Sequence, residues 1–160
     1  MAAVIDRQQV TAHSTGEALG ADIEGVDLAG PLASEAIAAV KAAWAQHLVL
    51  RFRGQRLADD ELLRFSRQFG ELDWAPIAAA RVKVPGEDRY VEAAPEGRQY
   101  VMVISNVIEN GQAIGQLGAY EAVWHTDMSY IPDPPSASAL YALEVPPEGG
   151  HRLLQHVSRL

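Results

Sequence analysis

The 160-residue sequence contains no cysteine. A chain without cysteine has neither a disulfide framework nor a thiolate metal site, and this composition is typical of a cytoplasmic protein. Long apolar runs are absent as well, since no segment approaches the roughly 18 consecutive apolar residues of a transmembrane helix. Charged residues interrupt the first thirty positions, which therefore differ from a signal peptide. We expect a cytoplasmic protein without a membrane partner.

Basic residues are few, with 13 Lys and Arg against 21 Asp and Glu, and the formal net charge is −8. Nucleic acids and anionic membranes bind basic surfaces, so this balance argues against both as partners. We expect a small-molecule substrate, which can still be anionic because a pocket can be locally basic, and a homo-oligomer is compatible with the composition. With 48% hydrophobic and 21% charged residues, the chain has the composition of one globular domain or part of one.

The first half of the chain carries alternating strand and helix signals. Apolar residues recur at spacings of three and four between Ser34 and His47, which predicts a helix there. Asp59 is a suitable N-cap for a second helix that continues to Phe69. We expect strands on either side of the first helix, at 9–13, 20–28 and 48–53.

The second half is less regular. Prolines and glycines divide 73–98 into loops, and loops of this length often carry function. An apolar run predicts a strand over 100–106, and Asn-Gly within 109–112 predicts a hairpin turn. A second apolar run at 137–143 predicts a buried strand.

His125 and Asp127 form the pattern around which we interpret the chain. On an extended backbone, residues i and i+2 project to the same face, about 6–7 Å apart along the strand, so an imidazole and a carboxylate can meet at one metal ion. With a distant second histidine, the set becomes the facial triad of a non-haem Fe(II) oxygenase. The alternative is a chance pairing at a solvated strand end. His47, at a predicted helix end, is expected to pack or face solvent rather than bind metal.

Sequence neighbours of this pair support the metal interpretation. Trp-His-Thr-Asp at 124–127 is followed by Pro-Pro at 134–135, an apolar run, and Pro-Pro-Glu-Gly-Gly at 146–150. In order and spacing these motifs resemble the TauD/TfdA family of Fe(II)/2-oxoglutarate-dependent dioxygenases. The stretch 20–28 and Phe-Gly-Glu-Leu at 69–72 also look like that family's N-terminal half.

The resemblance implies an α+β fold with a mainly β core, a double-stranded β-helix or jelly roll of the clavaminate synthase type with N-terminal helices. It also implies Fe(II), 2-oxoglutarate and O2, with oxidation to succinate and CO2 coupled to hydroxylation of a small organic, carboxylate-type substrate. His125 and Asp127 would bind iron. Asn106 is a candidate contact for the co-substrate, and Trp74, Trp124 and Tyr130 are candidates for the substrate pocket. Taurine-specific members have a histidine where this chain has Ala75, which argues against taurine.

The sequence departs from the family pattern after Gly150. We expect 1–150 to be the N-terminal part of a TauD/TfdA-like domain and 151–160 to be a tail translated from a shifted reading frame, which the gene sequence would test. The family's distal histidine ligand and 2-oxoglutarate-binding arginine have no counterpart here, so we expect an incomplete fold and an inactive chain. Two alternatives stay open, a non-catalytic fragment that associates with an intact homologue and a zinc-dependent hydrolase.

Overall fold

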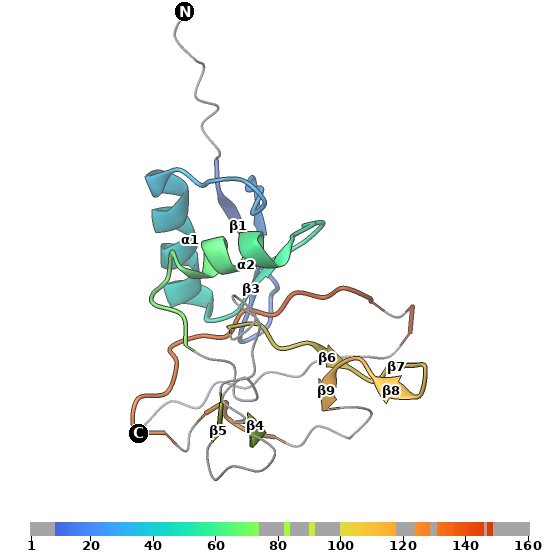
Figure 1. Ribbon diagram of the computed structural model, residues 1–160. Helices are drawn as coiled ribbons and strands as arrows, with labels where there is room; N and C mark the ends of the chain where they lie inside the picture. Colours follow the sequence, from blue (N-terminus) through green and yellow to red (C-terminus); the bar gives the residue numbers. More distant parts are fainter. Residues whose placement is uncertain are drawn as a thin grey trace, which may run out of the picture. The chain divides into compact units, whose positions relative to one another are not determined.

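The computed structural model describes residues 9–73, 82–83, 90–91, 100–117, 124–128, 131–145 and 147–148 (Figure 1). The chain divides into two compact units. Unit 1 comprises Met1–Gly70 with Leu140–Leu160, and unit 2 comprises Glu71–Ala139. Of the helices that the structure describes, none has the length and apolar character needed to span a membrane.

Unit 1 contains a three-stranded mixed sheet in the order β1-β2-β3. Its strands are β1 (Thr11–Ser14), β2 (Ala21–Glu24) and β3 (Leu50–Phe52). β1 and β2 are antiparallel, whereas β2 and β3 are parallel. A parallel pair needs a crossover connection, and helix α1 (Ser34–His47) supplies it. The three strands and this helix confirm the elements predicted for this part of the sequence, with shorter strands than expected.

The core of unit 1 lies between α1 and the sheet. α1 buries Val40 and Ala43 against Ala21 and Ile23 of β2. Because successive strand residues point to opposite faces, Asp22 and Glu24 project from the other side of the sheet. Further hydrophobic residues, only partly buried, pack against this core: Val10, Val26, Leu50, Phe52 and Phe69.

Helix α2 (Asp59–Ser66) begins one residue earlier than its capping signal predicted. Asp59 is the first helical residue, and the N-cap is Ala58, whose backbone N–H donates to the Glu61 carboxylate at 2.8 Å. The prediction that Asp59 caps the helix was therefore wrong, because the first helical N–H groups, those of Glu61 and Leu62, donate to the Ala58 carbonyl. Phe69 lies beyond the helix end, in a turn, where its ring meets Phe65 edge to face at 5.1 Å.

The Gln55 side chain joins the segment after β3 to the segment after β2, and the Tyr141 side chain joins the segment after β3 from further along the chain. Its Oε1 accepts from the Leu28 N–H at 2.9 Å, and its Nε2 donates to the Val26 carbonyl at 3.1 Å. The Tyr141 hydroxyl accepts from the Leu57 N–H at 3.1 Å and donates to the Gln55 carbonyl at 3.5 Å. These bonds satisfy loop backbone groups that have no strand partner.

Gly25 allows the chain to leave β2 close to the start of β1. Its φ is +82°, a conformation that residues with a side chain rarely adopt. A Cβ at this position would lie 2.1 Å from the Gln9 carbonyl oxygen. Gly25 is thus required both by its backbone conformation and by the close approach of the Gln9 carbonyl.

Strands in unit 2 are two residues long and form separate pairs. β4 (Val82–Lys83) pairs with β5 (Tyr90–Val91), β6 (Ile104–Ser105) with β9 (Gln116–Leu117), and β7 (Ile108–Glu109) with β8 (Gln112–Ala113). The β7–β8 turn consists of Asn110 and Gly111, with φ of 51° and 79°. Two positive φ angles are the signature of a type I′ turn, so the hairpin prediction is confirmed.

Two predicted strands differ from the structure. Only Ile104–Ser105 of the stretch 100–106 is a strand, and 137–143 contains none. Leu140 and Leu143 are 60% and 76% exposed, so the second run is also not buried. An apolar run becomes a buried strand only when another strand pairs with it and a second layer covers it, and no described strand pairs with this one. The described residues therefore show a partial mixed sheet with two helices, and the double-stranded β-helix stays a prediction.

Candidate metal site

His125 and Asp127 face each other in unit 2. Nε2 of His125 lies 3.2 Å from Oδ1 of Asp127, and the two side chains are 62% and 60% exposed. An imidazole nitrogen and a carboxylate oxygen are both ligands for first-row divalent metals. The pair expected from the sequence is thus brought together in the structure, within reach of ions in solution.

The backbone beneath this pair is not the expected strand. Trp124 lies at a bend, Asp127 and Met128 form a turn, and Met128 has a φ of +50°. The Ile131 N–H donates to the Met128 carbonyl at 3.2 Å. The prediction of a strand was wrong here, because no described strand pairs with this segment.

The distance between the two ligand atoms fits a metal site. Two ligands bound to one ion at about 2.1 Å and at right angles lie about 3.0 Å from each other. The observed separation of 3.2 Å needs little adjustment to reach that value. Without an ion between them, a proton on Nε2 can bridge the same two atoms.

Ser138 is a residue of this site that the sequence did not point to. Its Oγ donates to Oδ2 of Asp127 at 3.3 Å. The two oxygens of the Asp127 carboxylate therefore have different neighbours, since Oδ1 faces His125. No motif marks Ser138, which is eleven residues from Asp127 in an apolar run, and only the folded chain shows the contact.

Other predicted site residues are not assembled around the pair by the described structure. Trp124 precedes His125 and is 67% exposed. Asn106 is exposed between β6 and β7, and its proposed contact with a co-substrate stays a prediction. Trp74 and Tyr130 lie outside the described residues, as does the tail 151–160. Among the described residues there is no cluster of three or more His, Cys, Asp or Glu that could hold a metal.

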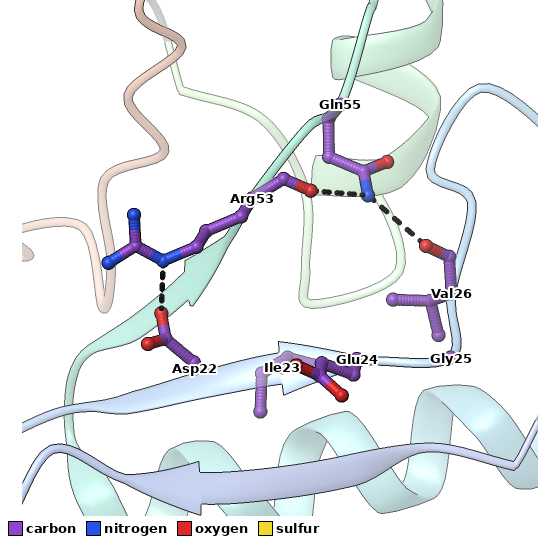
Figure 2. A pocket seen from close by; sticks show the side chains of 7 residues that line it. All are labelled: Asp22, Ile23, Glu24, Gly25, Val26, Arg53 and Gln55. Atoms are coloured by element: carbon purple, nitrogen blue, oxygen red, sulfur yellow. Dashed lines mark hydrogen bonds and ion pairs between the residues drawn. The ribbon is translucent and has the colours of Figure 1, made fainter.

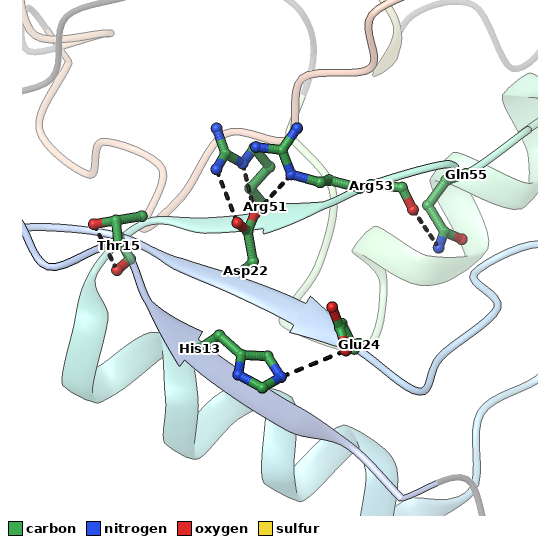
Figure 3. A network of polar contacts seen from close by, with 8 residues as sticks. His13, Thr15, Asp22, Glu24, Arg51, Arg53 and Gln55 are labelled. Atoms are coloured by element: carbon green, nitrogen blue, oxygen red, sulfur yellow. Dashed lines mark hydrogen bonds and ion pairs between the residues drawn. The ribbon is translucent and has the colours of Figure 1, made fainter.

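A second polar region lies on the exposed face of the unit 1 sheet. An open pocket of about 350 Å³ is lined by residues of β2 and of the segment after it, with Arg53 and Gln55 opposite (Figure 2). Arg51 donates from Nε and Nη2 to the two Asp22 oxygens at 2.6 and 2.9 Å, and Arg53 Nε lies 3.3 Å from Asp22 Oδ1 (Figure 3).

These hydrogen bonds, those from Arg51 above all, lower the pKa of Asp22 from 3.8 to about 2. Beside them on the same face, His13 Nε2 lies 3.4 Å from a Glu24 oxygen across the β1–β2 pair. The charges in this region neutralise one another. We therefore interpret it as a surface ion-pair network that links β1, β2 and β3.

Comparison with known proteins matches the family described as "Taurine catabolism dioxygenase TauD, TfdA family" over residues 9–156. Pentalenolactone F synthase from Streptomyces avermitilis is 36% identical over 141 residues, which are 87% of this chain and 42% of the relative. The 2,4-dichlorophenoxyacetate dioxygenase from Cupriavidus pinatubonensis, named as alpha-ketoglutarate-dependent, is 32% identical over 88% of this chain and 48% of its own.

A third relative, "(S)-phenoxypropionate/alpha-ketoglutarate-dioxygenase" from Delftia acidovorans, is 31% identical over 85% of this chain and 42% of its own. This chain thus spans less than half the length of the curated relatives it matches. Among solved structures, a putative alpha-ketoglutarate-dependent taurine dioxygenase from Burkholderia xenovorans is 34% identical. That match covers 49% of this chain and 27% of the other, and its TM-score of 0.42 is too low to establish a common fold.

The matched residues extend from before β1 to beyond the Gly-Gly sequence at 149–150 and include His125, Asp127 and Ser138. Whether 151–160 is a separate tail stays a prediction. With the family model matching nearly all of the sequence, the chain belongs to the TauD/TfdA family of dioxygenases.

Proposed function

We propose that this chain supplies two iron ligands to a dioxygenase site that uses Fe(II), 2-oxoglutarate and O2 to hydroxylate a small organic substrate. The observation that carries the proposal is the 3.2 Å approach of His125 Nε2 to Asp127 Oδ1. Family membership supports it, because relatives are named as alpha-ketoglutarate-dependent dioxygenases.

The two residues would hold the metal and leave its other positions accessible. His125 and Asp127 would occupy two adjacent positions, and the exposure of both side chains leaves room for further ligands. When bound, iron and 2-oxoglutarate would activate O2, the oxidant of the reaction: one oxygen atom would enter succinate as 2-oxoglutarate loses CO2, and the other would enter the substrate as a hydroxyl group. Trp124, next to His125 and largely exposed, would cover one side of the substrate and help to exclude water.

A third protein ligand must come from outside the described residues, which contain no suitable group of three. We propose a histidine in that role, together with an arginine for the 2-oxoglutarate carboxylate, because a guanidinium binds a carboxylate through two parallel hydrogen bonds. Without them the chain would bind iron weakly and turn over poorly.

For the substrate we propose a small organic carboxylate. Support comes from two relatives whose names specify phenoxypropionate and 2,4-dichlorophenoxyacetate. Asn106, Trp74 and Tyr130 stay candidates for contacts with the substrate or the co-substrate. A panel of aryloxy carboxylates and alkyl sulfonates, assayed by succinate release, would separate the two substrate classes.

The decisive experiment is an anaerobic titration of the purified protein with Fe(II), followed by 2-oxoglutarate, monitored by visible absorption. We expect a weak charge-transfer band in the wild type and in His47→Ala, and none in His125→Ala or Asp127→Ala. Equal loss from all three variants would contradict the ligand assignment.

Dependence on oxygen tests the alternatives to this function. Consumption of 2-oxoglutarate that requires O2 is expected for a dioxygenase and excludes a zinc-dependent hydrolase. Absence of both iron binding and turnover would indicate a non-catalytic chain. Sedimentation with and without an intact homologue would then show whether the chain associates with one.

A further inference from the structure

Resting on the function proposed above, we infer that Ser138 is a positioning residue that orients the Asp127 carboxylate toward the metal. The Ser138 hydroxyl donates to Oδ2 at 3.3 Å, while Oδ1 lies 3.2 Å from His125 Nε2. One oxygen is thus occupied by a hydrogen bond, and the other is presented to the position that a metal would take.

The orientation of this carboxylate decides how many metal positions it occupies. A carboxylate can bind an ion through one oxygen or through both. A hydrogen bond on Oδ2 favours binding through Oδ1 alone, which leaves one more position open for the co-substrate. Partners of this kind orient metal ligands and raise metal affinity in many proteins.

The chain between the two residues supports a defined position for Ser138. After Asp127, the Ile131 N–H donates to the Met128 carbonyl at 3.2 Å. Prolines at 132, 134 and 135 then fix three φ angles on the path to Ser138. Fewer backbone conformations are therefore available to move the hydroxyl away from the carboxylate.

Four variants test this role through metal affinity rather than turnover. Ser138→Ala removes the hydroxyl, Ser138→Thr retains it, and Ser136→Ala is the matched control two residues away. Asp127→Ala removes the ligand itself. The dissociation constant for Mn(II) would be measured by electron paramagnetic resonance on the purified protein, with the thermal midpoint as a check on folding.

We expect Ser138→Ala to weaken Mn(II) binding about tenfold, with an unchanged thermal midpoint. Ser138→Thr should retain most of the affinity, and Ser136→Ala should equal the wild type. If Ser138→Ala binds Mn(II) like the wild type while Asp127→Ala does not, the inference about Ser138 is wrong and the metal site stands. If Asp127→Ala binds as tightly as the wild type, or the wild type binds no Mn(II), the proposed function itself fails.

Discussion

Ile23 of β2 is 4% exposed in unit 1, whereas Ile108 of β7 is 68% exposed in unit 2. The same side chain in a short strand is buried in one unit and solvated in the other. The difference lies in what covers each strand. Helix α1 packs on β2, and it follows β2 within ten residues of sequence. All residues that the structure describes as buried lie in unit 1. The candidate metal ligands lie in unit 2, where the described side chains are less enclosed.

The largest expected difference between the units comes from truncating these two isoleucines. Ile23→Ala should lower the free energy of unfolding by about 2–5 kcal/mol, since it removes buried methyl groups and leaves a cavity in the core. Ile108→Ala should change it by less than about 0.5 kcal/mol, as for other exposed positions. Urea denaturation of both variants measures the difference. Similar losses would mean that Ile108 is also part of a packed core.

Substitution of two glycines, Gly25 in unit 1 and Gly111 in unit 2, compares the backbones of the two units. Gly25→Ala and Gly111→Ala both place a methyl group at a positive φ, which costs roughly 1–2 kcal/mol. Only at Gly25 would the methyl group also collide with a carbonyl oxygen, that of Gln9, because Gly111 has open space around it. We therefore expect the larger loss of unfolding free energy for Gly25→Ala in urea denaturation. A larger loss at Gly111 would contradict this steric account.

A smaller effect is expected from the ion pairs of unit 1 in acid. The pKa of Asp22 is about 2 in the folded chain, below its ordinary value of 3.8. The ionised carboxylate therefore stabilises the fold above about pH 4, and this contribution is lost as the pH falls toward 2. Because the Arg51 side chain is about half exposed, solvent screening keeps the effect small.

Asp22→Asn should reduce the dependence of the unfolding free energy on pH between about 4 and 2. Arg51→Met removes the other charge of this ion pair and keeps the aliphatic part of the side chain. It should reduce the same pH dependence. Urea denaturation at several pH values in this window measures both. An unchanged slope in both variants would show that the ion pair does not persist in solution.

Elements with local sequence signals could be predicted in both units. Helical spacing over 34–47 gave α1 with its observed bounds, and Asn110-Gly111 gave the β7–β8 turn. The start of α2 was less accurate, because Ala58, which has no capping side chain, is the N-cap and Asp59 is the first helical residue. The run 137–143 was mispredicted, since burial depends on a partner strand that no local pattern specifies.

The approach of His125 to Asp127 could be predicted from residue type and spacing, although the backbone could not. The segment is not a strand, so the i, i+2 argument gave the contact without the backbone, and the role of the pair as metal ligands stays a prediction. Ser138 could not be found from the sequence, because its contact with Asp127 depends on the path of the intervening chain. The hydrogen bonds of Gln55 could not be predicted from the sequence either, because they depend on the approach of loops from distant parts of the chain.

The Tyr141 hydrogen bond to Leu57 has a consequence for the order of folding. It joins residues 84 positions apart, whereas the Asp22–Arg51 pair joins residues 29 apart. Closing the longer loop costs about 1 kcal/mol more chain entropy. Early contacts are therefore expected among β1, β2, α1 and β3, with the segment around Tyr141 docking late. During synthesis, residues 9–70 could reach their native arrangement before Tyr141 leaves the ribosome.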